Sequence, residues 1–198
     1  MSGERLRIVV HELRSPVAAL VALAEQAAAR ALPAGVLRSV ARLAAAAGGD
    51  IERLLADPDL VSVRPEPVDL RDAVAVLVRP GVALSGDAVV APCDPTRLRQ
   101  AVGNLVANGL RHGASVAIDV HRSEQWAWVV VSDDGPGVAA GYDPFARGVS
   151  GVGSTGYGLW LARAIAEAHG GRLELDDRGG CPGASFRLSL PLSAAAPG

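Results

Sequence analysis

Apolar residues in the first third of the chain recur with the spacing of an amphipathic helix. They follow one another at alternating intervals of four and three residues at Leu6, Val10, Leu13, Val17, Leu20, Ala24, Ala27 and Ala31. Pro33 and Gly35 interrupt the pattern, which then resumes until Asp57 and Pro58 stop it. Because such intervals form the seam of a coiled coil or bundle, the pattern predicts an antiparallel helical hairpin over residues 4–56.

Two helices alone cannot close a hydrophobic core. A hairpin with one apolar stripe leaves that stripe exposed, and helices in proteins gain most of their stability by packing such a stripe. Pairing of two hairpins in a four-helix bundle buries both stripes. We therefore expect the protein to be a homodimer joined through residues 1–57.

The composition changes after the hairpin. Residues 58–67 contain three prolines and several charged residues, which is typical of a linker between two separately packed units. We therefore expect a linker over 58–67, a second domain over 68–192 and a flexible tail over 193–198.

The second domain alternates between helix and strand patterns. Helices are predicted over 69–78, 95–112 and 159–169, and strands around 82–84, 88–91, 115–121, 126–132, 172–175 and 184–190. Interleaved helices and strands are typical of an α/β two-layer sandwich. The expected fold class of the whole chain is therefore α+β, with a helical bundle followed by this sandwich.

Composition and charge exclude several classes of protein. Hydrophobic residues make up 49% and charged residues 20% of the chain, which supports a packed core rather than disorder. A net charge of −2 offers no basic field to attract nucleic acid, so we expect no DNA or RNA partner. The chain has no lysine, so phosphate contacts must come from arginine, backbone amides or a metal.

The sequence gives no sign of membrane insertion or secretion. The longest apolar stretch, residues 17–24, is less than half of what spans a bilayer, and the first residues lack a signal-peptide core. We therefore expect a cytoplasmic chain. Cys93 and Cys181 lack the spacing of metal ligands and are expected to be packing residues.

His11 on the first predicted helix is a candidate for chemistry. Pro16 removes the hydrogen bond to the carbonyl of Glu12, so the helix should bend after His11. A neutral imidazole is a competent nucleophile toward a phosphoryl group, and Glu12 can hold or take the proton on its other nitrogen. Ser15 lies one turn later on the same face. Alone, this motif is also compatible with a solvated surface pair.

The predicted helix 95–112 carries a polar face. Asn104, Asn108 and Arg111 or His112 lie on one side of it. Amide oxygens suit Mg²⁺ that is bridged to a polyphosphate, and an arginine one turn later can meet the phosphates. The alternative is the polar outer stripe of an ordinary amphipathic helix.

Two glycine-rich segments follow the hairpin of strands 115–121 and 126–132. Asp133 ends the second strand, where its carboxylate can accept a hydrogen bond from an amino group such as that of adenine. Gly135 and Gly137 let the backbone approach a flat base closely. Further glycines, up to Gly158, precede the next helix, whose N-terminus is a natural phosphate site. Each segment alone is compatible with a simple turn, but their order favours a nucleotide site.

In this order the motifs resemble the sensor histidine kinases, in which a dimerisation and phosphoacceptor domain precedes the ATP-binding domain shared with gyrase, Hsp90 and MutL. The similarity covers nearly the whole chain and implies a Bergerat-type ATP-binding fold. His-Glu-Leu-Arg-Ser-Pro is similar to the phosphoacceptor box, which implies phosphorylation of His11 with Glu12 as acid-base helper. Residues 94–112 are similar to the asparagine box, which implies Asn108 as the main Mg²⁺ ligand with Asn104 beside it. Asp133, Gly135 and Gly137 match the first glycine box, which implies Asp133 as the adenine-binding residue.

The resemblance also implies a mobile ATP lid. Residues 143–148, Asp-Pro-Phe-Ala-Arg-Gly, are similar to the phenylalanine box, and residues 153–159, Gly-Ser-Thr-Gly-Tyr-Gly-Leu, to the second glycine box. The further nucleotide-binding residues that it implies are Arg111, His112, Gly135, Gly137, Phe145, Arg147, Gly153, Thr155, Gly156, Gly158 and Leu159.

The chain departs from the family pattern in three places. Tyr157 stands where the family usually has leucine, a change that would alter lid packing. Ser15 replaces the usual threonine or asparagine that positions water for dephosphorylation, so the resemblance supports phosphatase activity less strongly than kinase activity. Only ten residues precede His11, so we expect either a fragment or a separate sensor as upstream regulator.

The resemblance implies an ATP-dependent protein-histidine kinase of a two-component system. With Mg²⁺, it would transfer the γ-phosphoryl group of ATP to His11 of the homodimer and then to an aspartate of a response-regulator receiver domain. Two alternatives are a phosphotransfer or scaffold protein with an inactive ATP-binding domain, and an ATPase or serine kinase of the same superfamily. Phosphorylation within a protomer or across the dimer stays open. The expected location is cytoplasmic, which also suits the cytoplasmic part of a larger membrane sensor.

Overall fold

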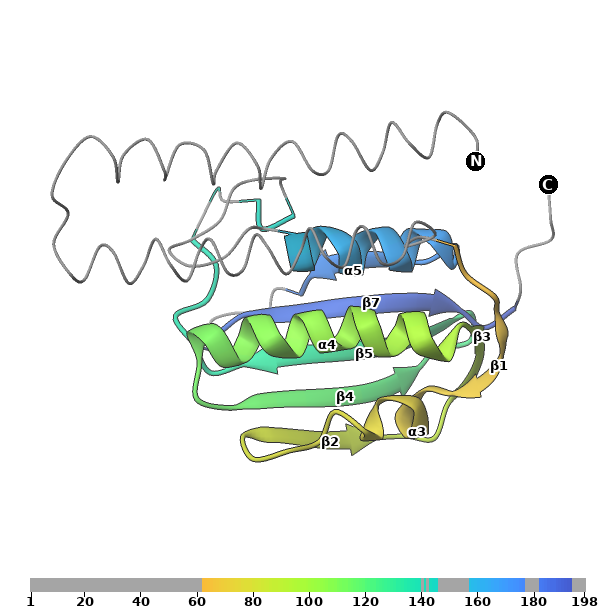
Figure 1. Ribbon diagram of the computed structural model, residues 1–198, viewed down its shortest axis with the longest axis horizontal. Coiled ribbons are helices and arrows are strands. Elements are labelled where there is room, and N and C mark those ends of the chain that lie inside the picture. The colour runs from red at the N-terminus through yellow and green to blue at the C-terminus, as the bar shows by residue number, and fades with distance from the viewer. Residues whose placement is uncertain (1–61, 140, 142, 146–156, 177–181, 194–198) are drawn as a thin grey trace, which may run out of the picture. The chain divides into compact units, whose positions relative to one another are not determined.

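Figure 1 shows the protein as a computed structural model that describes residues 62–139, 141, 143–145, 157–176 and 182–193. The predicted helical hairpin lies outside these residues, and so does almost all of the predicted tail. The dimeric bundle and the division of the chain into domains therefore stay predictions. None of the helices in the described ranges is long and apolar enough to cross a membrane.

Five strands form one mixed sheet in the order β2-β4-β5-β7-β6. Their bounds are β2 Val82–Gly86, β4 Val116–Arg122, β5 Trp126–Asp133, β6 Arg172–Leu175 and β7 Ser185–Pro191. β2 runs parallel to β4, and the other neighbours in the sheet are antiparallel. A separate two-stranded sheet pairs β1 (Glu66–Asp69) with β3 (Val90–Cys93).

The helices of this domain are α3 (Leu70–Ala75), α4 (Pro95–His112) and α5 (Tyr157–Ala168). Figure 1 shows α4 running along the sheet over β5. The core lies between the helices and the sheet and includes the buried side chains of Leu98, Ala101, Val102, Leu105, Ile118, Val129, Val131, Leu161, Ile165 and Leu188. This arrangement is the predicted α/β two-layer sandwich.

Alternation along the strands decides which face of the sheet meets the helices. Val116, Ile118 and Val120 of β4 are buried, whereas the intervening Ala117 is exposed and Asp119 is half-buried. Successive side chains of a strand point to opposite faces, so every second residue of β4 enters the core. The same alternation predicts the β4–β5 hairpin from the sequence, and the structure confirms it.

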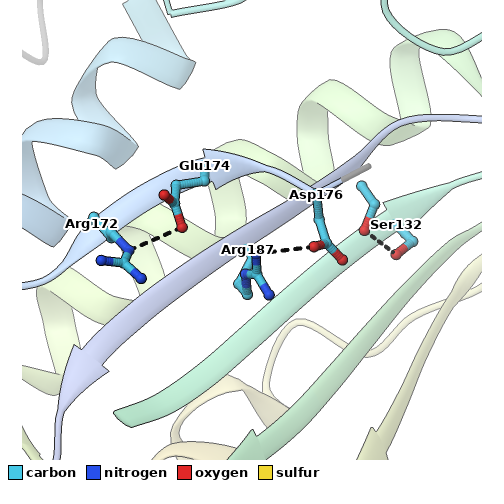
Figure 2. A network of polar contacts seen from close by, with 6 residues as sticks. Ser132, Arg172, Glu174, Asp176 and Arg187 are labelled. Carbon is cyan, nitrogen blue, oxygen red and sulfur yellow. Dashed lines mark hydrogen bonds and ion pairs between the residues drawn. The ribbon is translucent and has the colours of Figure 1, made fainter. Parts of the chain in front are cut away.

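The opposite face of the sheet is covered by its own long polar side chains. Arg172 pairs with Glu174 at 3.0 Å, and Arg187 pairs with Asp176 at 3.2 Å. Figure 2 shows both pairs on the sheet. The Arg172 guanidinium also lies 5.3 Å from the centre of the Trp126 ring. Arginine side chains cover apolar surface with their stems and guanidinium planes, while the charged group stays hydrated. This face of the sheet therefore does not need a second layer of helices.

The structure differs from the sequence-based expectations at the start of the domain. Residues 66 and 67, expected in the linker, belong to β1, which pairs with β3 in the register Glu66↔Cys93. The helix expected over 69–78 ends at Ala75, and the strand expected over 88–91 is instead Val90–Cys93. The bounds of β1 and β3 were missed because the pairing of these two distant segments sets them, and local periodicity does not report such a pairing.

Asp94 joins three parts of the domain at the N-terminus of α4. Its Oδ1 accepts hydrogen bonds from the amides of residues 96–97, at 2.9 and 3.1 Å, which caps the helix. Its Oδ2 accepts from the amide of Arg64 at 3.1 Å, and its own amide donates to Nε2 of buried His169 at 2.9 Å. Nδ1 of His169 lies 2.7 Å from the carbonyl oxygen of Ile165, so the neutral ring donates there.

Replacing His169 by leucine should test this junction. The substitution fills the space with an apolar side chain but removes both ring nitrogens, so we expect the free energy of unfolding to fall by about 1–3 kcal/mol. Chemical denaturation measures it. His121→Leu is the control, because His121 is exposed and its loss should change stability by less than about 0.5 kcal/mol. Equal stability of His169→Leu and the unsubstituted protein would contradict the junction's role.

Cys93 should be chemically inert while the domain is folded. Its side chain is 0% exposed, and burial, with smaller contributions from Asp94 and Glu66, raises its pKa to about 12. In a Cys181→Ser background, we expect a thiol-specific reagent at pH 8 to label the native protein far more slowly than the urea-unfolded protein. Labelling at the same rate in both states would show that Cys93 is accessible.

Candidate nucleotide-binding site

Asn104 and Asn108 occupy successive turns of α4, and both are half-buried. The amide nitrogen of Asn104 is buried and has no hydrogen-bond partner among the described residues. Gly158 in the first turn of α5 lies close by, since a Cβ there would stand 3.7 Å from Cγ of Asn104. A buried amide costs free energy unless a partner reaches it. Asn104 therefore suits a site that a polar ligand completes.

Asp133 ends β5 with its carboxylate held in one orientation. Oδ1 accepts hydrogen bonds from the amides of Gly135, at 2.9 Å, and Ala184, at 3.1 Å. The amide of Asp133 donates to the carbonyl oxygen of Ala184 at 2.9 Å, which joins this residue to the start of β7. Because Oδ1 holds both amides, Oδ2 is the oxygen that can accept a hydrogen bond from a ligand.

Glycines allow other segments to approach Asp133. A Cβ at Gly109 of α4 would stand 2.7 Å from Cγ2 of Val116 and 3.7 Å from Oδ2 of Asp133. A Cβ at Gly183, whose φ is +95°, would stand 1.7 Å from the carbonyl oxygen of Asp133. The absence of side chains at these positions therefore brings α4 and the segment before β7 against Asp133.

Sequence reasoning missed Gly109 and gave no role to Asp134. A glycine inside a predicted helix is unfavourable for helix formation, and that cost was the available sign that something packs against Gly109. Asp134 stood in the motif beside Asp133, but its hydrogen bonds run to the turn after α4 and could not be seen from spacing alone.

Gly135 and Gly137 stand where the sequence analysis expected close backbone approach. A Cβ at Gly135 would meet Oδ1 of Asp133 and the carbonyl oxygen of His112, each at 2.9 Å. Gly137 has φ of +79°, a conformation that favours glycine. Both positions thus require glycine for a physical reason, and Gly135 lets the turn after β5 lie close to the end of α4.

Phe145 of the predicted lid packs on the sheet. Its ring meets the buried Phe186 of β7 edge to face, with the ring centres 5.9 Å apart, and the guanidinium of Arg163 lies 5.6 Å from its centre. Its amide donates to Oδ1 of Asp143 at 2.9 Å. These contacts hold Phe145 against β7 and α5.

The structure describes some, but not all, of the site residues predicted from the sequence. Arg111 and His112 are exposed in the last turn of α4, and Leu159 is half-buried in α5. The predicted site residues outside the described ranges are His11, Glu12, Ser15, Arg147, Gly153, Thr155 and Gly156. Within the described ranges, no three His, Cys, Asp or Glu side chains gather to hold a metal.

Comparisons with known proteins agree with this geometry. The family model described as histidine kinase-, DNA gyrase B- and HSP90-like ATPase matches residues 93–194. The chain is 33% identical to the probable sensor histidine kinase TcrY of Mycobacterium tuberculosis, over 92% of this chain and 44% of that protein. It is 30% identical to the histidine protein kinase DivJ of Caulobacter vibrioides, over 92% of this chain and 36% of that protein. The chain thus spans about half the length, or less, of these curated relatives.

Solved structures show the same fold. The histidine kinase AdeS of Acinetobacter baumannii superposes with a TM-score of 0.62 at 19% identity, over 92% of this chain and 98% of that chain. The ATP-binding domain of PrrB from Mycobacterium tuberculosis superposes with a TM-score of 0.53 at 27% identity, over 65% of this chain and 98% of that chain. The family match extends over α4, the five-stranded sheet apart from β2, and Asp133. This chain therefore belongs to the histidine kinase-, DNA gyrase B- and HSP90-like ATPase family.

Proposed function

We propose that the chain is the catalytic core of a sensor histidine kinase that binds Mg-ATP and phosphorylates its own His11. The observation that carries the nucleotide part is the carboxylate of Asp133, whose Oδ1 is held by two amides while Oδ2 is available beside Gly109 of α4. The kinase part is supported by the phosphoacceptor motif and by relatives that are named histidine kinases.

Asp133 would select adenine by accepting a hydrogen bond. Its Oδ2 would accept from the exocyclic amino group of the base, whereas guanine presents a carbonyl oxygen at the equivalent position and would be repelled. Because Gly109 has no side chain, α4 lies against Asp133, and a Cβ there would stand 3.7 Å from this oxygen. The fixed orientation of the carboxylate lowers the entropic cost of forming the contact.

Asn104 and Asn108 would hold the phosphate end of the nucleotide. Their amide oxygens suit Mg²⁺, which would neutralise the charge that develops on the phosphates during transfer. The amide nitrogen of Asn104, which has no partner among the residues that the structure describes, would donate to a phosphate oxygen or to water. With no lysine in the chain, Arg111 or another arginine would supply the remaining positive charge.

His11 would act as the nucleophile. A neutral imidazole nitrogen attacks the γ-phosphorus, the bond to the bridging oxygen breaks, and ADP leaves with that oxygen. Glu12 would hold or take the proton on the other ring nitrogen. The phosphoryl group would then pass to a carboxylate of a response-regulator receiver domain.

The same proposal includes the assembly and location of the protein. The helical hairpin would pair with that of a second copy, and the core would act in the cytoplasm, where ATP and response regulators are present. A separate sensor or a preceding part of a longer protein would supply the input. The relatives exceed this chain in length, which fits a core that receives its signal from elsewhere.

Substitution of His11 should abolish stable phosphorylation and leave nucleotide binding unchanged. With γ-labelled ATP and Mg²⁺, the unsubstituted chain should gain label that survives alkali and is lost in acid, because phosphohistidine is acid-labile. His11→Gln should gain no label, while its Kd for Mg-ATP stays within about two-fold. Acid-stable label would instead favour a serine kinase, and persistent label on His11→Gln would refute the assignment of the residue.

Asp133→Asn should weaken ATP binding. The asparagine oxygen can still hold the amides of Gly135 and Ala184, but its NH₂ group then faces the amino group of adenine. Loss of a charged hydrogen bond predicts an affinity about ten-fold lower or worse, measured by calorimetry. Asp119→Asn on the outer face of β4 is the matched control and should bind like the unsubstituted chain. Equal affinities for Asp133→Asn and the control would remove Asp133 from the site.

A further inference from the structure

Asp134, the residue after Asp133, makes more hydrogen bonds through its side chain than Asp133 does. Its Oδ1 accepts from the amides of Ala114 at 2.7 Å and Ser115 at 2.9 Å, and its Oδ2 accepts from the hydroxyl of Ser115 at 2.8 Å. Its own amide donates to the carbonyl oxygen of Ser115 at 3.3 Å. An exposed carboxylate is therefore fully engaged with the turn that follows α4.

Electrostatics favour the charged form of this side chain. The hydrogen bonds from Ser115, first from its amide and then from its hydroxyl, and the bond from the Ala114 amide hold the pKa of Asp134 below its usual value. Asp134 is thus a carboxylate wherever the protein is folded and active. Charged acceptors bind amides more strongly than neutral acceptors do, so the carboxylate of Asp134 stabilises the position of the turn after α4.

The two turns also interlock sterically. A Cβ at Gly113 would stand 2.4 Å from Oδ1 of Asp134 and 3.0 Å from the amide of Gly135. A Cβ at Gly135 would stand 2.9 Å from the carbonyl oxygen of His112. Each turn has glycine where the other comes closest, so residues 112–115 and residues 133–135 pack as one unit.

This unit connects the two halves of the nucleotide site. His112 is the last residue of α4, which carries Asn108, and residues 113–115 follow it directly, whereas residues 133–135 begin with Asp133. Asp133 pairs with Val116 of β4 and is held by the amide of Ala184, the residue before β7, on one side. On the other side, Asp134 supplies the hydrogen bonds to the turn after α4. With one attachment removed, Asp133 could move relative to Asn108 while the core stays packed.

We propose that Asp134 is a positioning residue that fixes Asp133 against the end of α4 and thereby sets the selectivity of the site for adenine over guanine. This inference rests on the proposed role of Asp133 in adenine recognition. Asp134 does not touch the base in this proposal. It acts through the turn. By holding this turn against the end of α4, it keeps Oδ2 of Asp133, which would accept from adenine, at a constant distance from Asn108, which would hold the phosphate end.

The test compares nucleotide selectivity in three variants of the full chain. Dissociation constants for Mg-ATP and Mg-GTP would be measured by displacement of a fluorescent nucleotide, together with the thermal midpoint. Asp134→Ala should lose about ten-fold in affinity for ATP and less than about two-fold for GTP, because only adenine depends on the position of Asp133. Asp134→Asn keeps an oxygen for the two amides and should restore ATP affinity to within about three-fold.

Glu124→Ala is the matched control, since Glu124 is an exposed carboxylate in the turn at the other end of β5. It should leave both affinities unchanged. In autophosphorylation, Asp134→Ala should raise KM for ATP with kcat within about two-fold, because binding and not transfer is affected. If Asp134→Ala fails to fold, Ser115→Ala is the alternative, because it removes only the hydrogen bond from the Ser115 hydroxyl to Asp134. It should lower the ratio of ATP affinity to GTP affinity by about two-fold.

The outcomes separate this inference from the proposed function. The positioning role would be overturned if the unsubstituted chain binds Mg-ATP but the ratio of its affinities for ATP and GTP is unchanged in Asp134→Ala or Ser115→Ala. A fall in the thermal midpoint would not alter this conclusion. Failure of the wild-type chain to bind either nucleotide would overturn the proposed function and this inference with it. A lower ratio of ATP affinity to GTP affinity in Asp134→Ala, restored in Asp134→Asn, would support both the proposed function and the positioning role.

Discussion

Packing of α4 on the sheet is the contact on which the described site depends. One stripe of the helix, which includes Leu98, Val102 and Leu105, is fully buried. Asp94 and His169 hold its N-terminal end, and the turns after α4 and β5 interlock at its C-terminal end. A helix of this length fixed at both ends cannot rotate or slide without losing core contacts, so the residues on its other side keep their positions relative to the sheet.

The polar side of α4 shows how the site departs from what stability alone favours. Asn104 and Asn108 are half-buried next to the apolar stripe, and the Asn104 amide nitrogen lacks a partner among the described residues. Gly109 weakens the helix further. Such departures are expected where a ligand supplies the missing interactions, and the rest of the helix offsets their cost by burying leucine and valine.

The sequence predicted the elements whose signals are local. Helix 95–112 was predicted with the observed bounds because an Asp-Pro start and a regular apolar spacing mark it. The β4–β5 hairpin and Asp133 at its end followed from alternation and a polar turn. The bounds of β1 and β3 were missed, because their pairing joins segments far apart in the chain. The phosphoacceptor hairpin, with His11, stays a prediction.

The sequence by itself therefore determined the type of fold, the order of the motifs and the residue types available for chemistry, because each depends on neighbours in the chain. Only the tertiary structure decided which oxygen of Asp133 is available, which helix end meets which turn, and why Gly109 and Gly113 have no side chain. Those features depend on contacts between α4, β5 and β7, and the distances between such segments are set by packing of the common core.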